Sequence, residues 1–169
     1  MRIIVSDSSC LIDMHKGGLL GAMFELPYKF SIVDTLFENE LLSLSQNEKY
    51  MLRERGMNVV ELNGAQVQQA FQYKQEHPAL SPNDCFALVL SEITQDPILF
   101  TADARLKKLA KHKGIETHGV LWALDQLAAE PAIPHSLLCE SINRFIDDPL
   151  VFLSKTELNN RLRKLSPTR

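Results

Sequence analysis

Short runs of apolar and β-branched residues alternate with stretches of helical periodicity along most of the chain. Apolar residues at helical spacing predict helices at 9–16, 19–26, 35–46, 46–55, 64–76, 82–95, 104–113 and 119–129. The runs between them predict strands at 2–6, 30–33, 59–62, 98–101 and 115–118. Because strands that alternate with helices are typical of a parallel sheet, we expect a three-layer α/β/α fold around a central parallel sheet of four or five strands.

The pattern changes after Pro131 and Pro134, where two amphipathic helices are predicted at 135–147 and 155–165. No repeat, low-complexity tract or flexible linker separates them from the rest of the chain. We therefore expect a domain formed by residues 1–130, with residues 131–169 as a C-terminal helical extension packed on it. A chain of 169 residues can bury a sizeable core in one such domain.

The composition is that of an ordinary globular protein, with 45% hydrophobic and 23% charged residues. The apolar runs are too short to cross a bilayer and no secretory signal opens the chain, so we expect a cytoplasmic protein with no membrane partner. The three cysteines form no CxxC pair, which argues against a disulfide framework and against a zinc site.

The net charge of −3 does not indicate a nucleic-acid binder, but the positive charges are unevenly distributed. One predicted helix carries a basic cluster: Arg105, Lys107, Lys108 and Lys111. Such a run is either the solvated face of a helix or a rim that attracts phosphates to a neighbouring acidic site.

Two aspartates follow predicted strands. Asp7 comes directly after the first strand, and Asp103 lies two residues past the fourth. In an open parallel sheet the ligand crevice lies at the carboxyl ends of the strands, so both residues are candidates for a functional site. Each could instead be a helix N-cap, because Asp is favoured there.

Glu40 is selected by helix geometry. On a helix from residue 35 onwards it shares an apolar stripe with Leu36, Phe37 and Leu44, whereas Glu38 points away from that stripe. A carboxylate on an inward face is costly unless a cation or hydrogen-bond donors satisfy it. We therefore expect Glu40 to be functional and Glu38 to be solvated.

Asp84 has two interpretations. Its spacing from Ser81 is that of a capping box, in which it only accepts a backbone N–H. The helix that it opens is apolar nearly all round over residues 84–90, so its first turn would face the mouth of the sheet, where Asp84 could act in the site.

Four acids in one crevice would repel each other unless a cation held them. Oxygen ligands favour hard ions, so Mg²⁺ or Mn²⁺ is expected rather than zinc. Carboxylate-held ions suit phosphodiester hydrolysis, because they convert bound water to hydroxide and neutralise charge on the phosphate. Whether one or two ions act is left open by the sequence.

The order and spacing of five segments resemble those of the motifs in PIN-domain nucleases. Residues 4–12 resemble their opening strand and D-x-S-x-L-I pattern, and Glu40-Leu41 resembles their helical E-L. Residues 81–84 are similar to their third acidic motif, residues 99–106 to T-x-D-x-x-L, and residues 119–124 to the glycine-led helix that closes the domain. The resemblance covers about residues 1–130.

The resemblance implies Mg²⁺- or Mn²⁺-dependent endoribonuclease activity and a homodimer. VapC-like members of the family are toxins held by a cognate antitoxin, which implies such a partner here. The implied catalytic and metal-binding residues are Asp7, Glu40, Asp84 and Asp103, with Ser9 and Thr101 orienting them by hydrogen bonds. The alternatives are a non-toxin RNA-processing nuclease and a catalytically silent PIN-like binding module.

Two other classes place an aspartate after the first strand. A phosphatase with an aspartate nucleophile would want a second acid two residues later, where this chain has Ser9. A phospho-receiver domain would want an acidic pair near the first strand, where Ser6 and Ser8 stand. Both classes therefore fit less well than a nuclease.

Overall fold

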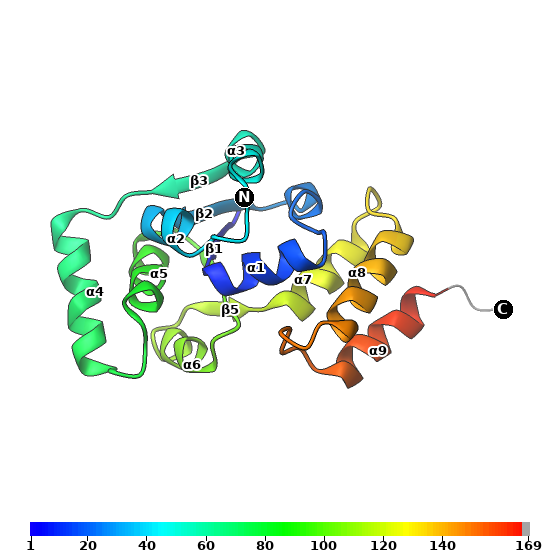
Figure 1. Ribbon diagram of the computed structural model, residues 1–169. Helices are drawn as coiled ribbons and strands as arrows, with labels where there is room; N and C mark the ends of the chain where they lie inside the picture. The colour runs from blue at the N-terminus through cyan, green and yellow to red at the C-terminus, as the bar shows by residue number, and fades with distance from the viewer. Residues whose placement is uncertain (167–169) are drawn as a thin grey trace.

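The computed structural model describes residues 1–166, which form five strands in one sheet (Figure 1). The strands are β1 (Ile3–Ser6), β2 (Lys29–Val33), β3 (Met57–Val60), β4 (Pro97–Phe100) and β5 (Glu116–His118). Every neighbouring pair is parallel, and the order across the sheet is β3-β2-β1-β4-β5. The predicted central parallel sheet is thus confirmed.

Residues 1–166 also contain nine α-helices and one 3₁₀ helix. The helices are α1 (Ser8–Lys16), η1 (Ala22–Glu25), α2 (Asp34–Asn39), α3 (Gln46–Glu54), α4 (Gly64–Glu76), α5 (Pro82–Ile93), α6 (Ala104–His112), α7 (Val120–Ala129), α8 (His135–Asp147) and α9 (Lys155–Leu165). None of these described helices has the length and apolarity needed to cross a membrane.

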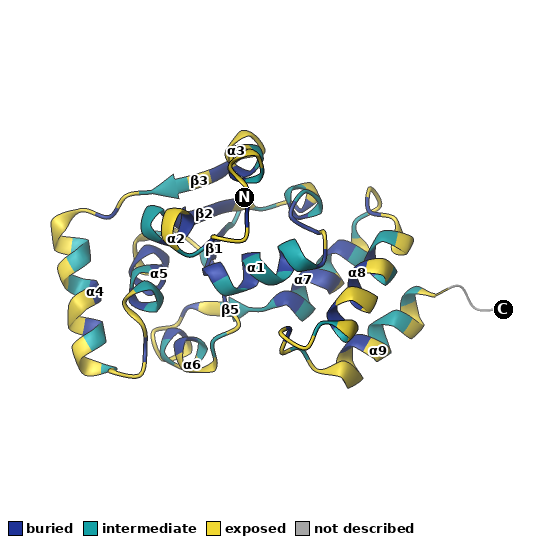
Figure 2. Cartoon of the chain, in the orientation of Figure 1, coloured by how far each residue is buried: buried dark blue, intermediate teal, exposed yellow. Residues whose placement is uncertain are grey.

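The central strands are covered on both faces. Successive side chains of a strand point to opposite faces, yet residues 4–6 of β1 and residues 98–100 of β4 are all buried. Helix α5 packs across β1, β2 and β4, while α1 packs against α7 and α8. Figure 2 shows the buried residues gathered on the strands and the adjoining sides of these helices. The predicted three-layer α/β/α architecture is confirmed.

Three predicted elements have different bounds in the structure. The helix expected at 19–26 is only the 3₁₀ helix η1, because Gly18 turns the chain at φ +72° and Pro27 follows closely. The helix expected at 35–46 ends at Asn39, and a Ser45–Glu48 capping box starts α3 separately. Strand β3 is 57–60 rather than 59–62, because its partner β2 ends at Val33, opposite Val60.

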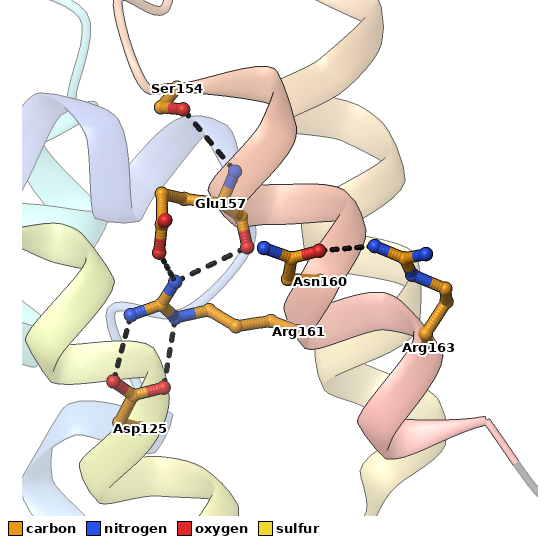
Figure 3. Close-up of polar contacts among 6 residues, drawn as sticks. All are labelled: Asp125, Ser154, Glu157, Asn160, Arg161 and Arg163. Carbon is orange, nitrogen blue, oxygen red and sulfur yellow. Dashed lines mark hydrogen bonds and ion pairs between the residues drawn. The ribbon is translucent and has the colours of Figure 1, made fainter.

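The C-terminal helices α8 and α9 share the core with α1 and α7. The Ser141 hydroxyl on α8 donates a hydrogen bond to the Gly17 carbonyl at 2.6 Å, directly after α1. On α9, Arg161 donates two hydrogen bonds of 2.9 Å to the Asp125 carboxylate of α7 and a third to Glu157 (Figure 3). These contacts fix both helices to the body that carries the sheet.

Gly17→Ala is expected to destabilise this packing. A Cβ at Gly17 would lie 2.5 Å from Cζ of Phe145, which is itself buried in the core. Overpacking of this kind costs about 1–3 kcal/mol, which lowers the melting temperature by roughly 3–10 °C. Thermal unfolding measures the change, and Gly21→Ala is the matched control because a Cβ there meets nothing within 4 Å. Equal melting temperatures for the two variants would contradict this packing.

Candidate active site

The connections of the central strands diverge at the carboxyl edge of the sheet. From β1 the chain passes to β2 on one side, and β4 later returns to the other side of β1. Open parallel sheets bind ligands at such a switch point. Asp7 directly follows β1 and Thr101 follows β4, and the Asp7 N–H donates to the Phe100 carbonyl at 2.9 Å. The two loops with the first and last candidate aspartates therefore meet at this point.

Asp7 is buried, with 4% of its surface exposed. Its Oδ2 accepts hydrogen bonds from the Thr101 hydroxyl at 2.8 Å and from the Ser9 hydroxyl at 3.0 Å. Burial raises the pKa of Asp7 to about 6. The two hydroxyls oppose this rise in pKa, whereas the nearby charges of Asp84 and Glu40 add to it. The carboxylate is thus held in one orientation beside other acids.

Glu40 lies at the C-cap of α2 instead of inside a longer helix. Its Oε1 accepts a hydrogen bond from the Ser8 hydroxyl at 2.9 Å, which places it at the start of α1, beside Asp7. The apolar stripe around it is buried, although the chain leaves the helix after Asn39. Glu38 is exposed and pairs with Arg53 at 3.1 Å, as its place off the stripe predicts.

Asp84 closes a capping box at the start of α5. Its Oδ2 accepts the Ser81 N–H at 2.8 Å, and its own N–H donates to the Ser81 hydroxyl at 3.0 Å. The capping interpretation therefore describes the contacts of this side chain. The negative charge of Asp84 also raises the pKa of Asp7, as expected of a carboxylate that lies near the buried one. Capping and a place beside the site are compatible.

Asp103 is the N-cap of α6. Its Oδ1 accepts the Leu106 N–H at 2.8 Å, and its own N–H donates to the Thr101 hydroxyl at 3.1 Å. Thr101 is buried and thus joins the backbone of Asp103 to the carboxylate of Asp7. The cap interpretation left open by the sequence holds for Asp103, whereas the Asp7 side chain caps no helix.

Glu40 and Asp84 lie near Asp7, but the four acids do not close on a single point. Within residues 1–166, no three His, Cys, Asp or Glu side chains converge as the ligands of one ion. Magnesium usually retains several water molecules and binds only one or two carboxylates, so this arrangement does not conflict with it. The donors near Asp7 are carboxylates and hydroxyls, and the repulsion that helps to raise the pKa of Asp7 is what a divalent cation relieves. The donor chemistry fits a hard divalent ion.

Ser8 contacts a candidate acid, a contact that the sequence alone did not predict. Its neighbours Ser6 and Ser9 have the same chemistry, but Ser6 donates to the backbone carbonyl of Asp7 and Ser9 to its carboxylate. Only Ser8 reaches Glu40. The contact joins residues 32 apart in sequence, so no local pattern distinguishes Ser8 from the other two serines.

The basic cluster of α6 divides into two sets. Arg105 and Lys108 line a groove of about 490 Å³, together with Leu109 and the loop of residues 76–80. That loop leads into the helix that carries Asp84, and α6 begins directly after Asp103, so the segments that line the groove are continuous in sequence with two of the acids. Lys107 extends towards Gly119 instead, and Lys111 is exposed outside the groove.

The sequence comparison agrees with this architecture. A family model described as a PIN domain matches residues 3–167, which is nearly the whole chain and includes α8 and α9. The chain therefore belongs to the PIN-domain family. PIN domains are generally nucleases, which act on nucleic acid, and they typically bind divalent metals. No significant match to a curated protein or to a solved structure was found.

Proposed function

We propose that this protein is a divalent-metal-dependent endoribonuclease that hydrolyses RNA phosphodiester bonds beside Asp7. The observation that carries the proposal is the buried Asp7 carboxylate at the switch point of the sheet. Both hydroxyl donors contact Oδ2, which orients the group, and within residues 1–166 Oδ1 has no hydrogen-bond partner, so it is available to a ligand. Burial of a carboxylate is costly, and a bound cation compensates for that cost.

In this proposal Mg²⁺ or Mn²⁺ would be held directly or through its bound water by four acids: Asp7, Glu40, Asp84 and Asp103. A bound ion supplies activated water and neutralises charge on the scissile phosphate. The protein positions the acids, since Ser9 and Thr101 orient Asp7 and Ser8 orients Glu40. Asp84 is fixed by the capping box that it forms with Ser81, and Asp103 by the start of α6, which it caps.

A panel of structured and single-stranded RNAs, with single-stranded DNA for comparison, tests the activity. We expect internal cleavage of RNA with Mg²⁺ or Mn²⁺ and none with EDTA. Cleavage at the same rate in EDTA would contradict metal dependence. Intact RNA under every metal, accompanied by measurable RNA binding, would instead favour the binding module.

We infer that the groove beside α6 binds the RNA backbone. Lys108→Gln is expected to weaken RNA binding several-fold and to reduce the salt dependence of log Kd by about 0.7, as loss of one single-strand phosphate contact does. Lys111→Gln is the matched control, because it removes the same charge from the same helix outside the groove. Fluorescence anisotropy over a salt series in EDTA measures both variants. Equal weakening by the two would mean that the helix acts only through its total charge.

We propose, more specifically, that the protein is the toxin of a toxin–antitoxin pair and forms a homodimer. The exposed apolar side chains of Leu150 and Phe152, 67% and 91% accessible, offer a surface that suits a protein partner or a second copy.

Induced expression is expected to arrest growth with the wild type but not with Asp7→Asn. Normal growth with an RNA-cleaving wild type would favour a processing nuclease, and sedimentation measures the oligomer.

A further inference from the structure

A cavity smaller than the groove beside α6 opens at the carboxyl edge of the sheet, on the side of β2 and β3. Its volume is about 190 Å³, and it is lined at the ends of these strands by Asp34, Thr35 and Glu61. Phe86 of α5 forms part of its wall. The elements that line it also carry two of the four acids, because α2 ends before Glu40 and α5 begins with the turn that contains Asp84. The cavity is therefore connected to the candidate site through α2 and α5.

The cavity wall is apolar and partly aromatic. Phe86 packs edge-to-face against Phe71, with ring centroids 6.1 Å apart and an interplanar angle of 73°, and Leu62 and Val67 complete the wall. The Phe71 ring is 51% exposed. Single-stranded RNA is recognised by placing unstacked bases against aromatic and apolar side chains. The volume is below the roughly 300–1,000 Å³ of sites for drug-sized ligands, which suits one base rather than a whole nucleotide.

The polar groups of the cavity favour a ligand that donates hydrogen bonds. Within residues 1–166 the Glu61 carboxylate has no hydrogen bond or ion pair, and no Lys or Arg lines the cavity. Asp34 uses Oδ1 to accept the Thr35 N–H at 2.7 Å, and the buried Thr35 hydroxyl has no partner in the described part of the chain. A phosphate would be repelled here, whereas a base edge with N–H groups would be bound.

We propose that this cavity binds a guanine base of the RNA strand, with Glu61 as the residue that recognises it. Guanine presents N1–H and the N2 amino group side by side, so one carboxylate accepts from both. Adenine and cytosine place an unprotonated ring nitrogen beside their amino group, and uracil has one N–H between two carbonyls, so each would also direct acceptors at the carboxylate. The inference rests on the proposed function, since it assumes an RNA substrate.

Binding of short U-rich oligoribonucleotides that differ in one central base tests the proposal. Fluorescence anisotropy in EDTA compares guanine, inosine, adenine, cytosine and uracil at that position with the wild-type protein. Inosine lacks only the N2 amino group, so the guanine oligonucleotide is expected to bind about tenfold more tightly than the inosine one. Glu61→Gln is expected to bring this ratio close to one, because an amide offers a single acceptor oxygen.

Glu54→Gln is the matched control, since Glu54 is an exposed glutamate at the end of α3 that does not line the cavity. It is expected to keep the wild-type preference. Equal binding of guanine and inosine by the wild type, preference for another base, or an unchanged preference in Glu61→Gln would each overturn the proposal. RNA cleavage without any base preference would contradict the guanine site but not the proposed nuclease. A preference for guanine without cleavage would support the guanine site and overturn the proposed nuclease.

Discussion

Asp7→Asn is expected to lower the rate of metal-dependent RNA cleavage by at least about a hundredfold, because a metal ion contributes several kcal/mol to such a reaction. The substitution removes the charge but keeps an oxygen that can accept from Ser9 and Thr101. The shape of the buried site is thus preserved while its attraction for a cation is reduced. Initial rates with Mg²⁺ for the wild type and the variant measure the effect.

Asp147→Asn provides the matched control for this change. Asp147 is an exposed residue at the end of α8, so the same chemical substitution there leaves the acids untouched. We expect wild-type cleavage from this control. Equal rates in Asp7→Asn and Asp147→Asn would mean that Asp7 does not take part in the reaction.

In metal-free protein, Asp7→Asn is expected to raise the free energy of unfolding above pH 6 by up to about 3 kcal/mol. Burial raises the pKa of Asp7 from 3.8 to about 6, so the folded state holds this proton more tightly than the unfolded chain does. The ionised group therefore destabilises the fold above pH 6. This cost fades as the pH falls from about 6 towards 3.8, and the advantage of the variant fades with it.

Urea unfolding in EDTA at a series of pH values measures the difference between the two proteins. A difference that stays constant with pH would show that Asp7 is not the group responsible. Adding Mg²⁺ at neutral pH provides a second measurement, because an ion that binds only the folded state stabilises it. The stabilisation is expected for the wild type and not for Asp7→Asn.

The sequence predicts the order and type of the elements well because these depend on local periodicity. The bounds that it misses depend on distant partners. Strand β3 ends at Val60 because β2 supplies no partner beyond Val33. The residue pattern of 57–62 cannot predict where a distant strand ends. The apolar stripe around Glu40 is buried although its helix is shorter than expected, because Leu41 and Leu44 are carried inward by the following turn.

The candidate site shows the same division between local and distant information. Asp7 and Asp103 can be placed from the sequence because they follow strands that fix their position along the chain. The contact of Ser8 with Glu40 and the separation of Lys108 from Lys111 need segments that are distant in sequence. The catalytic roles of the four acids stay predictions.

Helix α1 connects the acids to the C-terminal helices. It starts at Ser8, beside Asp7, and ends at Lys16. The next residue, Gly17, accepts a hydrogen bond from the Ser141 hydroxyl through its carbonyl and lies against Phe145. During synthesis, α1 therefore lacks the cover over its far end until α8 has left the ribosome. The start of α1, where Asp7 and Ser8 make their contacts, and its far end, which α8 covers, therefore complete their packing at different stages of synthesis.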